Sequence, residues 1–528
     1  MFTPNSEIRL LSVPLTMGDG KQLDFDDITA QTNYFKGKTQ FTYTDYNYQR
    51  QDRAITVSIP GGVDALMNCN YVMYQNKNFT NKWFYAFITR KEWVSENAAR
   101  LYLKTDVFQT WLFDFKLMPS VVEREHTPTD NYYEHTLPEN LETGEIFEIN
   151  RSHATTYSTA AANQNTFDSR YRCIVCTTTL WTATATTSDM LGGTPRSIYY
   201  YGFSRADLPR AIRDIVQNIG ADAILCVYAV PINALSWYEY HTEDWTYYVP
   251  HDRSNADERT FYMPPRAEVQ GMGNVKNKKC FCYPYHYYAL HDMAGHSVTL
   301  APQNFYHANQ GTFTIRNVFN GAPSPALTSI PLYYRNLGIG AQIYAEESTE
   351  SAVTFKDFPE LAYKTDFFQN YLALNKAKIT VNAAALGMSA MKPSPAQIAQ
   401  SADSAINVIA NMIDMQKIPD RANGNIGGNL LMLCGNTGIF LSEYRIKDEY
   451  LRIIDNYFTM FGYKVMTLKT PQFKSRPLFN YLKTAGIDIS GNIPQEDLQE
   501  LRTMFDNGIT VWHSGDNFGN YTGDNSPS

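Results

Sequence analysis

The sequence lacks a long hydrophobic run, because no stretch of about 18 uninterrupted apolar residues occurs in its 528 residues. We therefore expect no constitutive transmembrane helix. The N-terminal residues Met1–Glu7 have neither the basic stretch nor the apolar stretch of a secretory signal. No secretion leader is expected either.

Cysteine is scarce, and the seven residues are an odd number spread over a large chain. This pattern does not fit a disulfide framework and favours assembly in a reducing cytoplasm. Cys173 and Cys176 have C-x-x-C spacing, but they begin a Thr-rich strand pattern that runs to Thr187. Residues i and i+3 of a strand face opposite sides, so we expect two buried small side chains rather than a metal or redox pair.

Clustered metal ligands and catalytic motifs are missing as well. His286, His291, Asp292 and His296 form the densest histidine group, but the spacing of five does not match a zinc helix, and the neighbouring Tyr residues indicate a strand. The sequence has no Gly-x-Ser-x-Gly, no phosphate-binding loop and no complete dinucleotide-binding glycine motif. Carboxylate pairs are expected by chance among 53 acidic residues. We therefore predict no enzyme, no cofactor and no bound metal.

An excess of positive charge is also missing, since the net charge is −8 and the pI is about 5.7. Proteins that hold nucleic acid cluster Lys and Arg against its phosphates, so this class is disfavoured. An acidic wall, however, lets a duplex slide past without sticking.

Aromatic side chains are abundant, with 37 Tyr and 29 Phe. Aromatic and β-branched residues suit a half-buried pleated surface, so the fold class is predicted as mainly β with minor α. The length exceeds that of one hydrophobic core and indicates about three or four domains. Strand patterns are predicted at residues 54–60, 71–74, 83–88, 100–107, 173–187, 237–240, 245–248, 285–288, 311–317, 329–334 and 463–469.

Helical periodicity is rarer. We expect helices at residues 205–219, 442–460 and 494–505, the second supported by a Glu443–Lys447 pair and closed by Gly462. Asp506-Asn507-Gly508 predicts a tight turn, and the polar tail from Ser514 is expected to be frayed.

A long insert from Lys376 to Asn429 differs from the rest of the chain. Residues 377–414 contain ten Ala and only four charged residues, and Pro393 and Pro395 divide the segment into two arms. Small residues and Met suit a segment that packs loosely, moves or meets lipid, although an ordinary helical hairpin is the plain alternative. Its apolar positions are Ile379, Val381, Leu386, Met388, Met391, Ile398, Ile406, Ile409, Met412 and Ile413.

Several distinctive runs occur at the two ends of the chain. The N-terminal runs are residues 71–76, 81–87, 106–111 and 122–126, and the C-terminal runs are 462–464, 497–503 and 505–513. The motif positions singled out within them are Trp83, Phe84, Tyr85, Gln109, Trp111, Arg502, Asp506, Asn507, Gly508 and Trp512. In these runs and their order the chain resembles the tail knob (distal tail tube) proteins of small short-tailed phages that infect Gram-positive bacteria.

The resemblance implies a hexameric ring of β-barrel tube domains at the distal tail tip of the virion, assembled in the host cytoplasm. It implies double-stranded DNA passing through the lumen without specific binding, and a collar or connector protein as neighbour. The insert lies where the family has a channel-plugging loop. The resemblance implies that it plugs the channel and that, once released, it helps to breach the host membrane.

The resemblance also implies a division of the chain into five parts. These are a tube β-domain (1–125), an inserted β-rich knob domain (126–290), a second tube-like β-domain (291–375), the plug loop (376–429) and a part completing the tube (430–528).

Two other functions remain open from the residues. The aromatic clusters at Tyr199–Tyr201, Trp237–Tyr248 and Tyr283–Tyr288 could stack on sugars, which would make the chain a host cell-wall polysaccharide-binding module. The third possibility, a wall-degrading enzyme, has no catalytic motif to support it.

Overall fold

The computed structural model describes most of the chain outside the insert. It describes residues 5–44, 46, 54–58, 63–76, 82–155, 168, 171–182, 190–191, 194–195, 198–220, 223–232, 236–242, 246–251, 257–264, 269–293, 295–320, 326–335, 345–347, 349–356, 360–361 and 439–527. The insert 376–429, with its ten predicted plug positions, lies outside these residues. In the described part, no helix is both long enough and apolar enough to cross a membrane.

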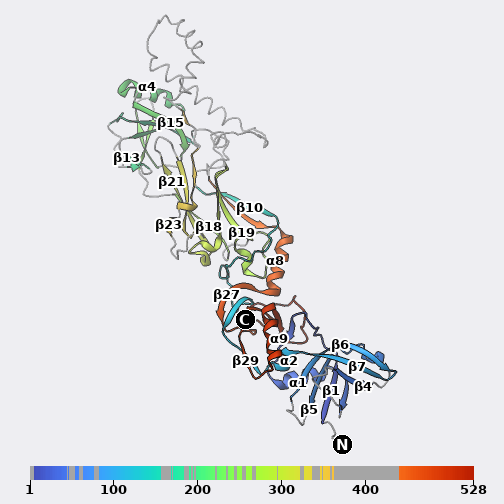
Figure 1. The fold of residues 1–528 in the computed structure, drawn as a ribbon. Coiled ribbons are helices and arrows are strands. Elements are labelled where there is room, and N and C mark those ends of the chain that lie inside the picture. The colour runs from blue at the N-terminus through green and yellow to red at the C-terminus, as the bar shows by residue number, and fades with distance from the viewer. Residues whose placement is uncertain are drawn as a thin grey trace. The chain divides into compact units, whose positions relative to one another are not determined.

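The chain divides into two compact units, and each is mainly β with a minor helical part, as predicted (Figure 1). Unit 1 comprises residues 1–142, 274–280 and 448–528, and unit 2 comprises 143–273 and 281–447. The five-part division stays a prediction.

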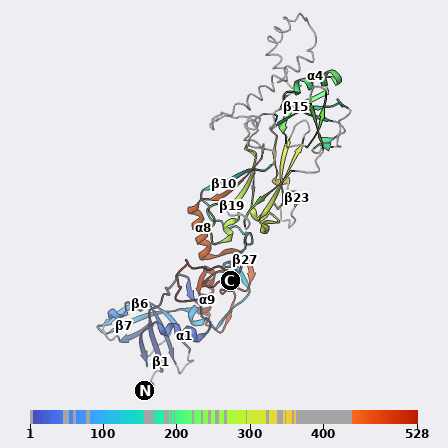
Figure 2. The same ribbon diagram turned by 180° about the vertical axis from the view of Figure 1, so that it is seen from behind.

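The first sheet of unit 1, sheet A, has six antiparallel strands. In order across the sheet they are β3 (Thr39–Thr44), β1 (Ser6–Leu11), β5 (Tyr71–Asn76), β6 (Phe84–Ser95), β7 (Ala98–Thr105) and β4 (Ala54–Ser58). The predicted pairing of the runs at 71–74 and 83–88 is confirmed, with Tyr71 opposite Phe87. Strands β6 and β7 form a long hairpin, which can be followed from both sides in Figures 1 and 2.

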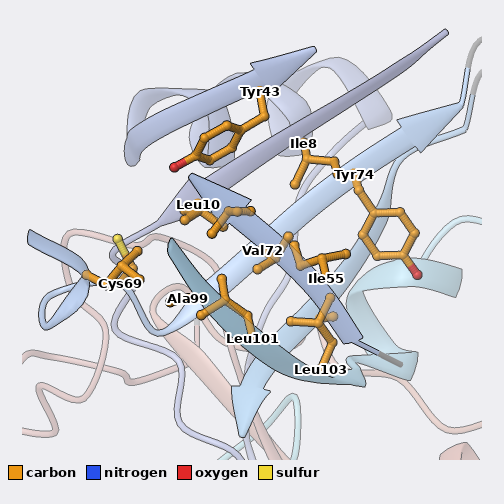
Figure 3. Close-up of a cluster of buried hydrophobic side chains, with 13 residues drawn as sticks. Ile8, Leu10, Tyr43, Ile55, Cys69, Val72, Tyr74, Ala99, Leu101 and Leu103 are labelled. Atoms are coloured by element: carbon orange, nitrogen blue, oxygen red, sulfur yellow. The ribbon is translucent and has the colours of Figure 1, made fainter. Parts of the chain in front are cut away.

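Alternation of apolar side chains gives sheet A two buried faces. On one face, side chains from all six strands meet in a single core, so the sheet curves around it; Figure 3 shows Leu10, Val72 and Leu101 pointing toward one another there. On the other face, Tyr71 and Tyr85 pack against Phe35 of helix α1 (Ile28–Gly37), with ring centroids 5.5 and 4.7 Å away. Burial on both faces explains why β5 is apolar almost throughout.

Sheet B joins the two ends of the chain inside unit 1. Its strands, in order, are β2 (Lys21–Leu23), β30 (Ile509–Trp512), β28 (Phe479–Ala485), β9 (Ser120–Glu125) and β27 (Tyr463–Lys469). Beside it lie the strand pair β8 (Phe115–Leu117) and β29 (Ile489–Gly491), and the helices α2 (Val107–Trp111), α8 (Asp448–Phe461) and α9 (Gln495–Asn507). The strand predicted at 463–469 is confirmed.

Among the residues of unit 2 that the structure describes, the strands form three larger sheets and one strand pair. The four-stranded sheet D consists of β10 (Ile146–His153), β26 (Phe440–Ile446), β19 (His286–His291) and β20 (Ser297–Leu300). The six-stranded sheet E consists of β16 (Ser236–His241), β17 (Thr246–His251), β14 (Tyr199–Phe203), β11 (Tyr171–Thr177), β15 (Ile224–Pro231) and β25 (Glu360–Leu361). The remaining strands are β18 (Asp257–Tyr262), β21 (Thr312–Asn320), β22 (Ala326–Tyr334), β23 (Ala345–Glu347) and β24 (Val353–Phe355) in one sheet, and the pair β12 (Met190–Leu191) and β13 (Thr194–Pro195).

The helix predicted at 205–219 is confirmed as α4 (Leu208–Ile219), whose Leu208, Ile212 and Ile215 are fully buried. The strand predicted at 173–187 is wrong over residues 178–182, since β11 ends at Thr177, and residues 183–187 lie outside the described part of the chain.

The helix predicted at 442–460 is wrong over its first six residues, 442–447. Residues 440–446 form β26, which pairs with β10 on one side and β19 on the other, and α8 begins only at Asp448. The Glu443–Lys447 pair is accordingly absent, since Glu443 contacts His286 and Lys447 contacts Glu145. Pairing with distant strands overrides the local helical periodicity here.

Two C-terminal predictions were also wrong. Asp506 and Asn507 are the last residues of α9 rather than a hairpin turn, and Gly508 ends that helix with φ +97°. The tail is not frayed, because Tyr521 packs on Trp512 with ring centroids 5.1 Å apart and Asn525 accepts a hydrogen bond from the Leu478 N–H. Buried aromatic partners hold a segment whose composition alone indicates disorder.

Gly462 provides a test of how tightly β9 and β27 are packed. It has φ +63°, and a Cβ added there would overlap the backbone carbonyl of Glu125, whereas Gly486 has φ +65° and open space around it. We expect Gly486→Ala to cost about 1 kcal/mol for the backbone conformation alone. We expect Gly462→Ala to cost about 3 kcal/mol or more, because the strands must also separate. Urea unfolding of the two variants measures the difference, and equal costs would contradict it.

Candidate functional site

The family-motif residues of both chain ends come together in unit 1, around the short helix α2. All five residues of α2 are buried, and the Asp106 carboxylate caps the helix by accepting a hydrogen bond from the Gln109 N–H, at 3.1 Å. Asp106 also accepts a 2.9 Å hydrogen bond from the Tyr71 hydroxyl. The helix is therefore fixed to sheet A at its first turn.

The Gln109 amide connects three segments. Its Nε2 donates to the Leu23 carbonyl at 2.7 Å and to Gln22 Oε1 at 3.2 Å. In return, Gln31 Nε2 donates to the Gln109 carbonyl at 2.8 Å and to its Oε1 at 3.0 Å. Buried amides with satisfied donors and acceptors specify one arrangement of the backbone around them.

Trp111 links the N-terminal motif to the C-terminal one. Its indole Nε1 donates to Asp497 Oδ2 of α9 at 2.8 Å, across 386 residues of sequence. The Lys82 ammonium lies 3.7 Å from the centre of the indole ring, which is a cation–π geometry. Phe84 packs edge-on against the same ring at 6.2 Å.

The C-terminal motif positions serve the same framework. Asp506 Oδ1 accepts hydrogen bonds from Thr484 Oγ1 at 2.8 Å and from the Ile487 N–H at 3.2 Å. Trp512 is fully buried, 4.4 Å from the ring of Phe479, in the same core as Tyr85.

The remaining motif positions lie nearer the surface or close to a neighbouring ring. Arg502 makes a 3.6 Å ion pair with Asp488, and Asn507 is exposed. Trp83 lies 5.5 Å from the Lys36 ammonium. A Cβ at Gly508 would collide with the Tyr481 ring. The motif residues thus stabilise the packing of unit 1 rather than form a reactive centre.

A buried ionic cluster in unit 1 was missed from the sequence. The fully buried Glu139 carboxylate contacts both Arg124 and Lys279, and it accepts a 2.9 Å hydrogen bond from the Lys464 N–H. Beside it, the Asn277 side chain donates to Asp455 Oδ1 at 2.9 Å. These residues come from four separate stretches of sequence, so no local pattern could have identified them. Removing one partner of such a cluster would leave a buried charge uncompensated.

His126, the last residue of an N-terminal motif, is buried and neutral. Its Nδ1 accepts from the Tyr481 N–H at 2.7 Å, so the proton is on Nε2, which faces the Thr459 carbonyl at 3.1 Å. Burial, assisted by the charge of Arg476, lowers the pKa of His126 to about 3. Asp106 shows the opposite effect, since burial raises the pKa of its carboxyl to about 6.

The other candidates from the sequence are structural. Cys173, Cys176, Cys280 and Cys282 are buried, as expected for small apolar side chains. His286 is buried and lies 2.8 Å from Glu443 across sheet D, and His291 lies 2.8 Å from Ser442. Across the described ranges, no group of three or more His, Cys, Asp or Glu could hold a metal ion.

His126 and Asp106 predict opposing pH dependences. Between pH 6.5 and about 3 the unfolded chain binds a proton at His126 that the folded chain does not, so His126 removes stability as the pH falls. Between about pH 4 and 6 the folded chain holds a proton at Asp106 that the unfolded chain loses, so Asp106 removes stability as the pH rises.

We therefore expect Asp106→Asn to lose about 2 kcal/mol more than the native protein between pH 6 and pH 4. The variant keeps an oxygen that can cap α2. His126→Asn should change in the opposite sense. Urea unfolding at pH 4, 5, 6 and 7 measures both, and parallel pH profiles for all three proteins would contradict the assignment.

Comparisons with known proteins agree with this framework. The family described as Bacillus phage phi29 tail knob protein gp9, C-terminal domain, matches residues 255–526, and the family described as caudoviral major tail protein N-terminus matches residues 4–116. The chain is 25% identical to the tail knob protein gp9 of Bacillus phage PZA over 606 residues, and 24% identical to that of phage phi29 over 608 residues. Both alignments cover 98% of each chain.

A solved structure has a similar fold. The tail knob protein gp12 of bacteriophage C1 matches with a TM-score of 0.65 and 16% identity, over 98% of both chains. Since the gp9 C-terminal family covers residues 255–526, which is more than half of the 528, this chain belongs to the phage tail knob proteins and is a structural component of the virion at the phage tail.

Proposed function

We propose that the chain forms a homo-hexameric ring, the distal knob and tube through which double-stranded phage DNA is ejected. The observation that carries this proposal is the open sheet A. Its edge strands β3 and β4 each pair with only one neighbour among the described strands. Unpaired edges of this kind are templates for strands of another chain, and a head-to-tail contact repeated around an axis closes into a ring.

The β6–β7 hairpin provides a second contact surface. Trp93 near its tip is 71% exposed, and Met67, in the 3-10 turn Val63–Leu66 and its following residues, is 76% exposed. The Lys91 ammonium holds the two features together by donating to the Leu66 carbonyl at 2.7 Å. Large exposed apolar side chains at one place fit burial against another copy.

The charge of the chain supports a passive conduit. With a net charge of −8, subunits arranged in a ring would repel DNA phosphates rather than bind them. DNA then passes without specific contacts, and a collar or connector protein adjoins the ring on its other side. The chain carries out no chemistry in this role.

The insert 376–429 is proposed as the channel plug. Six copies of a segment with few charges can bury their apolar positions, such as Met388, Ile406 and Ile409, against one another inside a lumen. Receptor contact or DNA pressure then releases them, as in other order–disorder switches. Once released, mild amphipathic segments can partition into the host membrane interface, each weakly and six together more strongly.

The ring itself is tested by negative-stain electron microscopy of the purified protein, for which we expect six-fold rings. The double variant Trp93→Ser/Met67→Ser should shift the population to smaller species, because it removes exposed apolar area without touching the core. Leu468→Ser, which removes an equally exposed side chain in β27, is the matched control and should keep the rings. Native protein without rings would overturn the proposal, and rings unaffected by the double variant would overturn the hairpin contact.

The plug is tested by deleting residues 377–420. We expect rings to persist with an open centre that stain and DNA can enter, and vesicle leakage caused by the native ring to disappear. A variant in which the same residues are replaced by a Gly/Ser stretch of equal length separates loss of apolar contacts from loss of length. An unfolded deletion product would show that the segment is part of a core. Leakage that is unchanged without it would contradict the membrane role.

A further inference from the structure

The structure assigns a sugar-binding site to the β16–β17 edge of sheet E, and we propose that it takes a neutral sugar unit of a surface polysaccharide. The site consists of Arg172, Gly202, Trp237, Glu239 and Tyr248, and is called the edge site below. It lies within unit 2 and does not depend on ring assembly.

Strand register places the five residues on one face of the sheet. Ile174 is opposite Gly202, Gly202 is opposite Tyr248, and Tyr248 is opposite Glu239. Directly opposed residues of antiparallel strands share a face, and so do residues two apart in one strand. Arg172 and Trp237 therefore join the same face, with Trp237 on the outer strand β16 and Arg172 on the inner strand β11.

Trp237 is held in a fixed orientation. Its indole Nε1 donates to the Ile232 carbonyl at 2.7 Å, and its ring lies over Gly202, where an added Cβ would be 2.5 Å from Cζ3. Any residue larger than Gly202 would push the ring away. A pre-positioned, partly exposed aromatic ring beside a second ring, that of Tyr248 at 6.4 Å, offers a stacking surface at low entropic cost.

Arg172 is the most unusual member of the edge site. Its side chain is only 8% exposed, and its guanidinium carbon lies 3.6 Å from the centre of the Tyr248 ring. Among the described residues, no carboxylate pairs with it, and its buried Nε has no hydrogen-bond acceptor. The Nε itself is closed to solvent, so a ligand can meet only the small exposed part of this side chain. Every N–H of a guanidinium is a donor, so a ligand there must bring hydrogen-bond acceptors.

Glu239 offers hydrogen-bond acceptors, whereas Arg172 offers only donors. Its exposed carboxylate accepts a hydrogen bond from the Tyr248 hydroxyl at 3.3 Å, which leaves further acceptor positions free for a ligand. A ligand for the edge site must therefore present an apolar face to a ring, acceptors to Arg172 and donors to Glu239. A sugar ring has all three, with C–H bonds on its faces and hydroxyls around its edge.

The alternatives fit less well. A nucleobase also stacks on aromatic rings, but its phosphates would meet Glu239 and a chain of net charge −8. An apolar peptide would leave Arg172 and Glu239 without partners.

The test uses the full-length protein on an array of neutral hexose, N-acetylhexosamine and polyol-phosphate glycans, with a single-stranded oligonucleotide as a further probe. We expect binding to neutral glycans, reduced about tenfold or more by Trp237→Ala and by Arg172→Met, since each removes a contact of roughly this size. Tyr238→Ala is the matched control, because Tyr238 is exposed in the same strand on the opposite face. It should change binding less than about twofold.

The Glu239→Gln variant separates loss of glycan binding from misfolding, because this exposed residue can be changed without altering the core. It should weaken binding several-fold while the unfolding midpoint stays constant. Absence of binding to every glycan would overturn the proposal. So would preferred binding to the oligonucleotide, preferred binding to the polyol-phosphate glycans, or glycan binding that is unaffected by Trp237→Ala and Glu239→Gln in folded protein.

Discussion

The pairing of β9 with β27 and β28 is the constraint on which unit 1 depends. Through it, residues near 125 become neighbours of residues near 480, and His126 accepts a hydrogen bond from a backbone N–H that lies 355 residues later in the sequence. Closing such a long loop costs entropy that local contacts do not repay, so the buried partners on both sides must supply it. The Trp111–Asp497 hydrogen bond and the cluster around Glu139 likewise join separate stretches of the sequence within unit 1. Unit 1 is therefore complete only when both chain ends are present.

This arrangement accounts for the place of unit 2 in the sequence. All of unit 2 lies between residues 143 and 447, as an insertion between two halves of unit 1, and only residues 274–280 of this stretch belong to unit 1. An insertion of this kind can vary without disturbing the framework, because the framework is held by α2, α9 and sheet B. The buried family-motif residues form part of that framework and hold its elements together. The surfaces proposed for function, the hairpin tip of unit 1 and the edge site of unit 2, lie outside it.

The two functional proposals depend on different interactions, so an experiment can contradict one without contradicting the other. Ring formation depends on exposed strand edges and apolar side chains, and therefore on burying area between copies. The edge site depends on an oriented aromatic ring and on the polar groups of Arg172 and Glu239 beside it, and therefore on stacking and hydrogen bonding to a ligand. A tail tip that both conducts DNA and touches polysaccharide would join the two roles in one chain.

The sequence alone determined the mainly β class, through its aromatic and β-branched residues, and the family, through motif runs at both chain ends. It located strands where apolar runs or apolar alternation are plain, as in β5, β6 and β21, but it did not predict β1, β10 or β28. It failed where distant partners decide. Residues 442–446 have helical periodicity but form the middle of sheet D, and the polar tail is held by Trp512 and Arg476. Within the edge site, Trp237 and Tyr248 were visible as an aromatic cluster. Only the tertiary structure brought Arg172 to them, since the register across the four strands β11, β14, β17 and β16 sets which side chains share a face.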